Sequence, residues 1–139
     1  MANTQGFASK AAELTHTEFI IWLTTTSRDL SPQPRPVWFI WYQDQFLIYS
    51  RPDTHKVRHI QERPHVALNF NSDPQAHLNV VVFKGVARLA PEVPPADQIT
   101  EYVEKYREGM QTIGMNPEQF AGAYSSPILV EVGEVEGLA

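Results

Sequence analysis

The sequence contains no cysteine, which excludes disulfides, thiol nucleophiles, iron–sulfur clusters and cysteine-bound zinc. No apolar run approaches the ~20 residues that a membrane helix requires, so we expect no membrane partner. The N-terminal segment lacks the basic start and apolar block of a secretory signal, which predicts a cytoplasmic protein. Basic residues are also few: 11 Lys and Arg face 16 Asp and Glu, and a net charge of −5 argues against nucleic-acid binding.

Motifs of several enzyme classes are also missing. The sequence has no Gly-x-Ser-x-Gly elbow, Walker loop or dinucleotide glycine fingerprint, so hydrolase and P-loop chemistries lack support and no catalytic side chain is predicted. His55, His59 and Glu62 recur at helical spacing, which is one way to hold a metal ion. Without a His-Glu-x-x-His pattern or a fourth ligand, we expect an exposed polar face and no metal site.

The sequence predicts a mainly β fold in a single domain, residues 1–139, with a core at about 17–135. Segments rich in β-branched and aromatic residues predict six strands. These are 19–26, 37–42, 46–50, 66–71, 78–89 and 128–132. The polar, proline-dense segment 27–36 is interpreted as a connection. Gly85 inside the fifth strand predicts a bulge or a bend, and the break at 43–45 predicts a hairpin.

Helical spacing and capping signals predict three short helices and a weaker fourth. They cover residues 54–62, 97–108 and 116–124, with the weaker one at 9–16. The first must stop near Arg63 because Pro64 follows, and Gly109 is expected to end the second. Antiparallel strands with interspersed helices indicate a barrel or curled sheet of the all-β or α+β kind.

The predicted strand 37–42 is apolar on both faces. Val37, Phe39 and Trp41 alternate with Trp38, Ile40 and Tyr42. One face can fill a barrel, but the other must also be covered, by a second chain, by a flat ligand or by a helix of the same chain. If a helix of the same chain covers this face, the predicted helix 97–108 is the obvious candidate. Because so much apolar surface is unusual on a monomer, we predict a homodimer.

The segment 51–63 is basic, although the protein as a whole is acidic. Four of the 11 Lys and Arg lie within it: Arg51, Lys56, Arg58 and Arg63. Arg51 sits where a strand ends and Lys56 lies in the first turn of the next predicted helix. Free amides and the positive end of the helix dipole point there, which suits a phosphate or carboxylate. The alternative is a solvated basic face that forms surface ion pairs.

Three segments in this order resemble a known family. They are Arg35-Pro36-Val37-Trp38-Phe39, the stretch Tyr-Ser-Arg-Pro-Asp-Thr-His-Lys-Val-Arg at 49–58, and Pro64-His65-Val66-Ala67-Leu68. Together they resemble the pyridoxamine 5′-phosphate oxidase-like split-barrel family. The similarity runs from about 19 to 90 and continues weakly through Tyr124-Ser125-Ser126. It is closest to the small actinobacterial-type branch whose members are assigned as users of the deazaflavin coenzyme F420.

The resemblance implies an FMN-binding split barrel, a six-stranded antiparallel barrel of Greek-key type. In that family the barrel dimerises, and a flavin or deazaflavin (here FMN or F420) lies in a groove between the subunits. The strand that matches Pro36, Val37 and Trp38 runs beside the ring. The residues that match Tyr49, Ser50, Arg51, Thr54, Lys56 and Val57 hold the ribityl chain and phosphate. The turn at 28–32 departs from the family by lacking an Asp-Gly pair.

Two classes of function follow. The first is an oxidoreductase in which reduced F420 or FMN passes hydride to a small organic acceptor. The cofactor would supply the redox chemistry, and the protein its position and electrostatics. Vitamin B6 oxidation is not expected, because the family's substrate residues near the C-terminus have no match. The second class is a non-enzymatic flavin- or haem-binding split barrel that stores its ligand.

Overall fold

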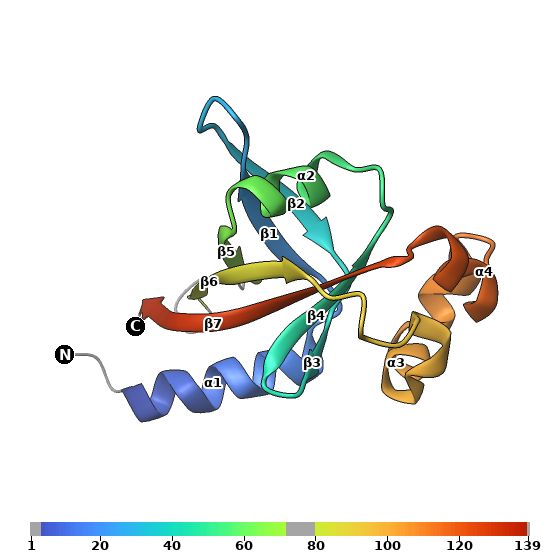
Figure 1. Ribbon diagram of the computed structural model, residues 1–139. Coiled ribbons are helices and arrows are strands. Elements are labelled where there is room, and N and C mark those ends of the chain that lie inside the picture. Colours follow the sequence, from blue (N-terminus) through green and yellow to red (C-terminus); the bar gives the residue numbers. More distant parts are fainter. Residues whose placement is uncertain (1–3, 72–79, 139) are drawn as a thin grey trace.

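The computed structural model describes residues 4–71 and 80–138 (Figure 1). A single antiparallel sheet curls around the core, and four α-helices and one 3₁₀ turn lie around it. The strands are β1 (Ile21–Thr26), β2 (Pro32–Val37), β3 (Ile40–Tyr42), β4 (Gln45–Ser50), β5 (His65–Asn69), β6 (Val80–Leu89) and β7 (Ser126–Leu138). The helices are α1 (Thr4–Thr17), α2 (His55–Glu62), η1 (Ala96–Gln98), α3 (Thr100–Thr112) and α4 (Pro117–Ala123). None of the helices in these residues is long and apolar enough to cross a membrane.

The order of the strands explains why the sheet curls. The order is β2-β1-β5-β6-β7-β4-β3, so β2 and β3 are the two edges. Only Trp38 and Phe39 separate these edges in the sequence. The two ends of the sheet are therefore held together by a two-residue connection, as in a split barrel. The fold class predicted from the sequence is confirmed, with seven strands in place of six.

The seventh strand, β2, lies in the segment predicted to be a connection. Its prolines at 32, 34 and 36 occupy every second position, opposite Thr26, Thr24 and Trp22 of β1. Because proline has no N–H, the donors available to β1 are the residues between the prolines, which all face the same way. An edge strand tolerates this arrangement, since the side without donors faces away from the sheet. The prediction was therefore wrong for residues 32–36.

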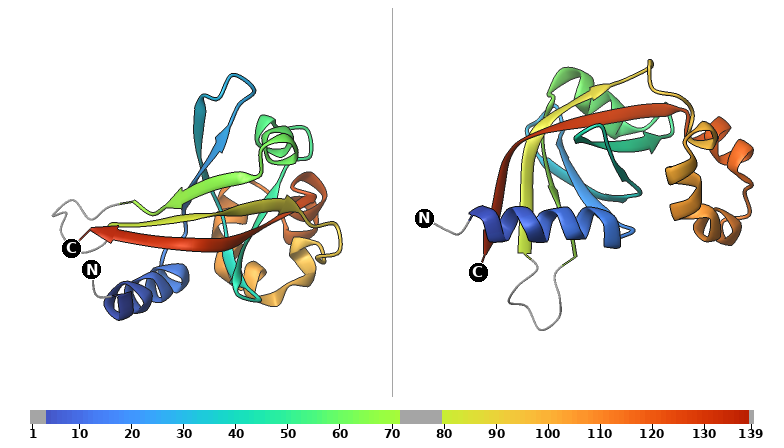
Figure 2. Two further views of the ribbon diagram at one scale, coloured as in Figure 1. Left: turned by 60° about the vertical axis from the view of Figure 1, so that its left-hand side comes forward. Right: turned by 90° about the horizontal axis from the view of Figure 1, so that it is seen from below.

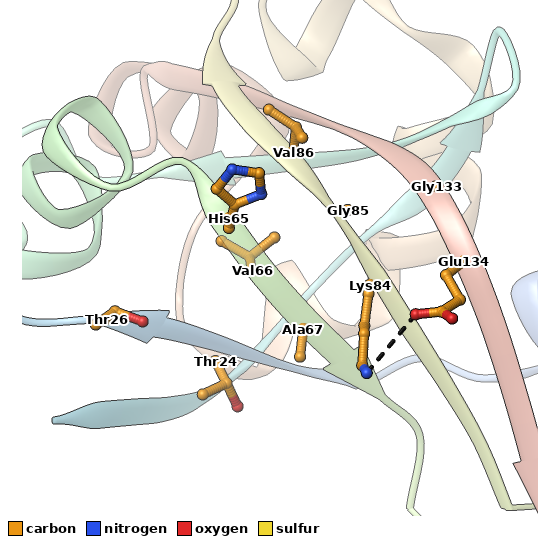
Figure 3. A pocket seen from close by; sticks show the side chains of 10 residues that line it. All are labelled: Thr24, Thr26, His65, Val66, Ala67, Lys84, Gly85, Val86, Gly133 and Glu134. Carbon is orange, nitrogen blue, oxygen red and sulfur yellow. Dashed lines mark ion pairs between the residues drawn. The ribbon is translucent and has the colours of Figure 1, made fainter. Parts of the chain in front are cut away.

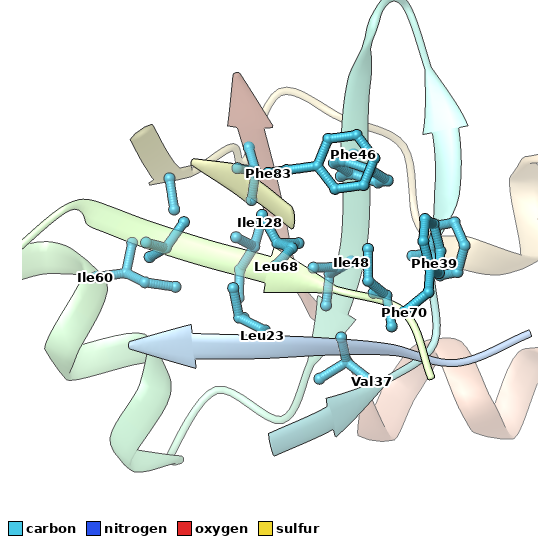
Figure 4. Close-up of a cluster of buried hydrophobic side chains, with 14 of the residues drawn as sticks. Leu23, Val37, Phe39, Phe46, Ile48, Ile60, Leu68, Phe70, Phe83 and Ile128 are labelled. Atoms are coloured by element: carbon cyan, nitrogen blue, oxygen red, sulfur yellow. The ribbon is translucent and has the colours of Figure 1, made fainter. Parts of the chain in front are cut away.

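The predicted strand 37–42 is divided between β2 and β3, with Trp38 and Phe39 between them. The predicted alternation of its side chains nevertheless holds. Val37 and Phe39 point into the barrel core together with Phe46, Ile48 and residues of β1, β5 and β6 (Figure 4). Trp38 and Ile40 belong to a second core outside the sheet.

That second core lies under η1, α3 and α4. These helices bring Tyr102, Tyr106 and Phe120 against Ile40 and the other apolar residues of the outer face. Ile40 is only 1% exposed. In Figure 2, α3 and α4 form a lobe at one side of the barrel, while α1 lies along another side. A helix of the same chain therefore covers this face, and the apolar strand no longer supports the argument for a dimer.

The remaining elements follow the sequence closely. The predicted β3–β4 hairpin is confirmed, and its turn consists of Gln43 and Asp44, both with positive φ, because Gln45 already belongs to β4. The register shifts between Lys84 and Gly85, which confirms an irregularity at Gly85, but the extra residue is Gly133 of β7: Lys84 pairs with Glu134 and Gly85 with Val132. Asn116 caps α4 by accepting a hydrogen bond from the Gln119 amide. Residues 78 and 79 of the predicted fifth strand lie outside the described residues.

Three elements extend beyond their predicted bounds. Helix α3 continues through position 109 to Thr112, and helix α1 is longer than the predicted 9–16. Strand β7 runs to Leu138, well beyond the predicted end at 132. It is long because residues 126–130 pair with β4, while pairing with β6 begins at Ile128 and continues to Leu138. One extended strand thus joins β4 to β6 within the sheet.

Candidate functional site

A groove of about 370 Å³ opens where the β2–β3 junction, the end of β4, the start of α2 and the end of α4 meet. Its volume lies within the range of about 300–1,000 Å³ typical of small-molecule sites. It is lined by Ile20, Pro36, Val37, Trp38, Tyr49, Ser50, Lys56, Ile113, Phe120 and Tyr124. Six of these residues were predicted from the sequence as cofactor-binding. The structure therefore brings two distant predicted segments, 36–38 and 49–56, to one place.

The three other predicted site residues lie around the groove. Arg51 is exposed, and its guanidinium carbon lies 4.8 Å from the centre of the Tyr124 ring. The Thr54 hydroxyl lies 3.1 Å from that of Ser50 and donates to the Arg51 carbonyl at 3.2 Å, so it stabilises the turn into α2. Val57 is 5% exposed and its side chain belongs to the barrel core. Only its backbone could face a ligand.

An aromatic wall forms one side of the groove. The Trp38 ring stacks with Phe120 at a centroid distance of 5.3 Å, and Phe120 stacks with Tyr124 at 4.5 Å. Both pairs are inclined by 15°. Trp38 also stacks with Tyr106 of α3 at 4.6 Å. This wall offers extended apolar surface to a flat ring, since aromatic rings favour offset-stacked or edge-on contacts.

Lys56 supplies the positive charge of the groove. It is partly buried in the first turn of α2, and among the described residues no carboxylate lies within ion-pair distance of it. Burial lowers the pKa of its ammonium group, and the nearby charge of Arg35 lowers it further. An anion in the groove would offset both effects. The geometry thus favours an anionic group at the helix start.

Sequence reasoning missed four of the lining residues. Ile20 precedes β1, Ile113 follows α3, and Phe120 and Tyr124 come from α4. The last two belong to the lobe whose packing on the barrel cannot be read from local patterns. Only Tyr124 carried a signal, because it lies in the segment with weak family similarity.

A second hollow, of about 450 Å³, lies on the outer face of the sheet (Figure 3). It is lined by residues of β1, β5, β6 and β7, among them Thr24, Ala67 and Val86. Its only lysine, Lys84, is paired with Glu134 at 3.6 Å and Glu136 at 3.2 Å. Because this charge is already compensated and no aromatic residue lines the hollow, the groove at Lys56 is the better candidate for a cofactor.

The histidines do not join either site as a metal centre. His55 and His59 lie on α2 with ring centroids 6.2 Å apart. The Nδ1 atom of His59 is 2.9 Å from the Thr25 hydroxyl, and that of His55 is 2.9 Å from the Arg58 guanidinium. Within residues 4–71 and 80–138, no three histidine, aspartate or glutamate side chains are grouped to hold a metal ion.

Comparison with known proteins connects this geometry to a family. Residues 7–129 match the family model described as pyridoxamine 5′-phosphate oxidase. No curated protein sequence matches the chain.

Many solved structures share the fold. A conserved hypothetical protein, Rv2991 from Mycobacterium tuberculosis, superposes with a TM-score of 0.73 at 15% identity, covering 99% of this chain and 84% of that chain. An F420 reductase gives 0.66 at 19% identity, covering 89% and 94%. HutZ, the haem storage protein from Vibrio cholerae, gives 0.65 at 11% identity, covering 95% and 94%. At these identities the likeness shows the fold alone.

Proposed function

Because the chain belongs to the pyridoxamine 5′-phosphate oxidase-like family of split barrels, we propose that its groove at Trp38 and Lys56 binds FMN or F420 and that the protein is a cytoplasmic oxidoreductase. Both cofactors combine a flat three-ring system with a phosphate. The observation that carries the proposal is the partly buried Lys56 at the start of α2, which has no ion-pair partner within residues 4–71 and 80–138 and faces a groove walled by aromatic rings.

Each part of the groove has a role in this proposal. The backbone of Pro36, Val37 and Trp38 lies beside the ring and offers its polar groups to the ring's edge. Lys56 and the free amides of the first turn of α2 hold the phosphate. Arg51, which lies over Tyr124, is free to add a two-pronged contact at the same end.

The groove also explains why no catalytic side chain needs to be found. The bound cofactor would supply hydride chemistry toward a small organic acceptor, while the chain binds and orients it. The aromatic wall excludes water from one face of the ring, which leaves the other face for the acceptor. No lining residue other than Lys56 and two tyrosines carries an ionisable side chain, so proton transfer from the protein is not required.

Titration of FMN and of F420 into the purified protein tests the proposal. We expect saturable binding of at least one, with quenched cofactor fluorescence because Trp38 and Tyr124 line the groove. A Soret band together with no binding of either cofactor would favour the second candidate, a haem-storing protein. That candidate is supported by the fold of HutZ, but no histidine lines the groove. Failure to bind any of the three would overturn the proposal.

We further propose that a second copy of the chain packs on the outer hollow of Figure 3. Val86 there is 45% exposed, and Lys84 and Glu134 have opposite charges within one surface. A twofold interface needs such self-complementarity, because each patch meets its own copy. Light scattering at micromolar concentration should give the mass of a dimer. Val86→Glu should shift that mass toward a monomer, and a monomeric unsubstituted protein would contradict the proposal.

A further inference from the structure

A separate cavity of about 390 Å³ lies where the end of α1, strand β3 and helix α3 meet. Its lining residues are Thr15, His16, Phe19, Ile40, Trp41, Glu101, Glu104 and Lys105. It shares no residue with the groove at Lys56. One side is aromatic and aliphatic, and the rim is acidic.

The amine of Lys105 is held at this cavity by one hydrogen bond and by the rings of Phe39, Tyr106 and Phe19, the last two at 5.4 and 5.9 Å. Its Nζ atom donates to the Phe39 carbonyl at 3.0 Å and lies 3.8 Å from the centre of the Phe39 ring. Among the described residues, no carboxylate approaches it within 4.0 Å. Lys10 and Lys84, by contrast, each form an ion pair.

The hydrogen bond to the Phe39 carbonyl requires only an N–H group, which a neutral amine also has, whereas the face of the Phe39 ring attracts the charged form. Donation to the carbonyl orients one N–H bond and leaves the lone pair free to point elsewhere. Burial lowers the pKa of Lys105 to about 8, against an opposing effect of Glu101 and then Glu18. The other titratable groups facing it are Glu104 of the same helix and His16 of α1. At pH 7.4 about a fifth of a group with this pKa is neutral, which is over a hundredfold more than for an ordinary lysine.

We propose that Lys105 is a nucleophilic amine that forms an imine with aldehydes carrying an aromatic or apolar group. The nitrogen lone pair forms a bond to the carbonyl carbon, and the carbonyl oxygen leaves as water with the two amine protons. No oxidant or reductant is needed. Phe19, Ile40 and Trp41 receive the apolar group, and Glu101 and Glu104 at the rim disfavour aldehydes with a negative charge.

Trapping the imine tests this assignment. The purified protein is treated at pH 7.4 with benzaldehyde and cyanoborohydride, then digested with trypsin and mapped by mass spectrometry. Modification prevents cleavage after Lys105, so peptide 89–107 should appear with one added benzyl group. We expect labelling of Lys105 at least tenfold faster than of Lys84, and slower labelling when glyoxylate replaces benzaldehyde.

Two variants show whether Lys105 and its surroundings in the cavity cause the labelling. Lys105→Arg keeps the charge but forms no imine, so trypsin should cleave after the arginine at position 105 and give peptide 89–105 without a label. Glu101→Gln removes a charge that favours the protonated amine, so it should raise the labelling rate of Lys105. Labelling of Lys105 no faster than that of Lys84, or equal labelling by benzaldehyde and glyoxylate, would overturn the proposal.

Discussion

The indole ring of Trp38 stacks on the phenol ring of Tyr106, with centroids 4.6 Å apart and planes within 5°. Trp38 belongs to the junction between the two edge strands, and Tyr106 to helix α3. Helix α3 therefore positions one face of the proposed cofactor groove. The helix itself does not line the groove; only Ile113, directly after its end, does. A charge at Trp38 would disturb this packing as well as ligand binding, so substitutions in α3 test the groove more cleanly.

Gly109→Ala should weaken cofactor binding. A Cβ atom at position 109 would lie 3.0 Å from two ring atoms of Trp38, so the indole must move away from α3 and toward the groove. Alanine is the better helix former by up to about 1 kcal/mol, so the helix itself should not be lost. We expect at least a fivefold rise in the dissociation constant of the bound cofactor, measured by fluorescence titration.

Gly122→Ala is the matched control, since a Cβ there meets nothing within 4 Å. It should leave affinity unchanged and keep or slightly raise the melting temperature. If Gly109→Ala bound the cofactor as tightly as Gly122→Ala, Trp38 would not form part of the ring site.

Tyr106→Phe should destabilise the protein by about 1–3 kcal/mol. The Tyr106 hydroxyl accepts from the Phe39 amide and lies within donating distance of the Phe39 and Phe19 carbonyls, all at 2.8 Å. Its removal leaves a buried N–H without a partner at the β2–β3 junction. Urea unfolding measures the effect.

Tyr102→Phe is the corresponding control. The Tyr102 hydroxyl is buried and has no hydrogen-bond partner among the described residues, so its removal should be neutral or stabilising. Equal losses in the two variants would mean that ring packing, and not hydrogen bonding to Phe39, holds the junction.

Lys56→Ala should weaken binding of FMN or F420 by about 10- to 100-fold, because a hydrogen bond between charged groups is worth roughly 1.5–3 kcal/mol. Stability without ligand should be unchanged or slightly higher, since burial already disfavours the ammonium group. Lys84→Ala, which removes an exposed lysine of the second hollow, should leave the affinity for FMN or F420 unchanged. Unchanged affinity of Lys56→Ala would move the anion site toward Arg51 or Arg58.

The strands and the groove differ in how well a sequence can reveal them. The alternation of Val37 and Phe39 with Trp38 and Ile40 correctly predicts two apolar faces, because each face is a local property of the chain. Segment 32–36 resembles a connection in the sequence, because each of its prolines, taken alone, argues against a strand. Their two-residue spacing places every missing N–H on the outer side of an edge strand. This can be recognised only when the pairing of β2 with β1 is known.

Gly109 shows a second limit. Glycine usually ends a helix, which is why the sequence predicts a stop there. In the structure it lies inside α3 because Trp38, 71 positions earlier, occupies the space that a side chain would need. Phe120 reaches the groove through the same long-range packing. Lys56, in contrast, was predicted correctly to lie at a helix start, because its neighbours in the sequence define that place.

The final prediction concerns Lys105 and the dependence of stability on pH. Burial lowers its pKa from 10.5 to about 8 in the folded chain. Between these values the unfolded chain binds more protons than the folded one, so stability should rise with pH through this window. The full change in the pKa of Lys105 corresponds to about 3 kcal/mol in the free energy of unfolding. Screening at a partly exposed side chain reduces it, and we expect about 1–2 kcal/mol. Urea unfolding at pH 7 and at pH 9.5 should show a rise that is smaller in Lys105→Met than in the unsubstituted protein by this amount, because Lys56, whose pKa burial also lowers, contributes to the rise in both. Lys84→Met should retain the full rise, because its ion pairs raise the pKa of Lys84 out of the window. An identical pH dependence in Lys105→Met and the unsubstituted protein would mean that the amine stays protonated, and would also remove the basis for its reactivity.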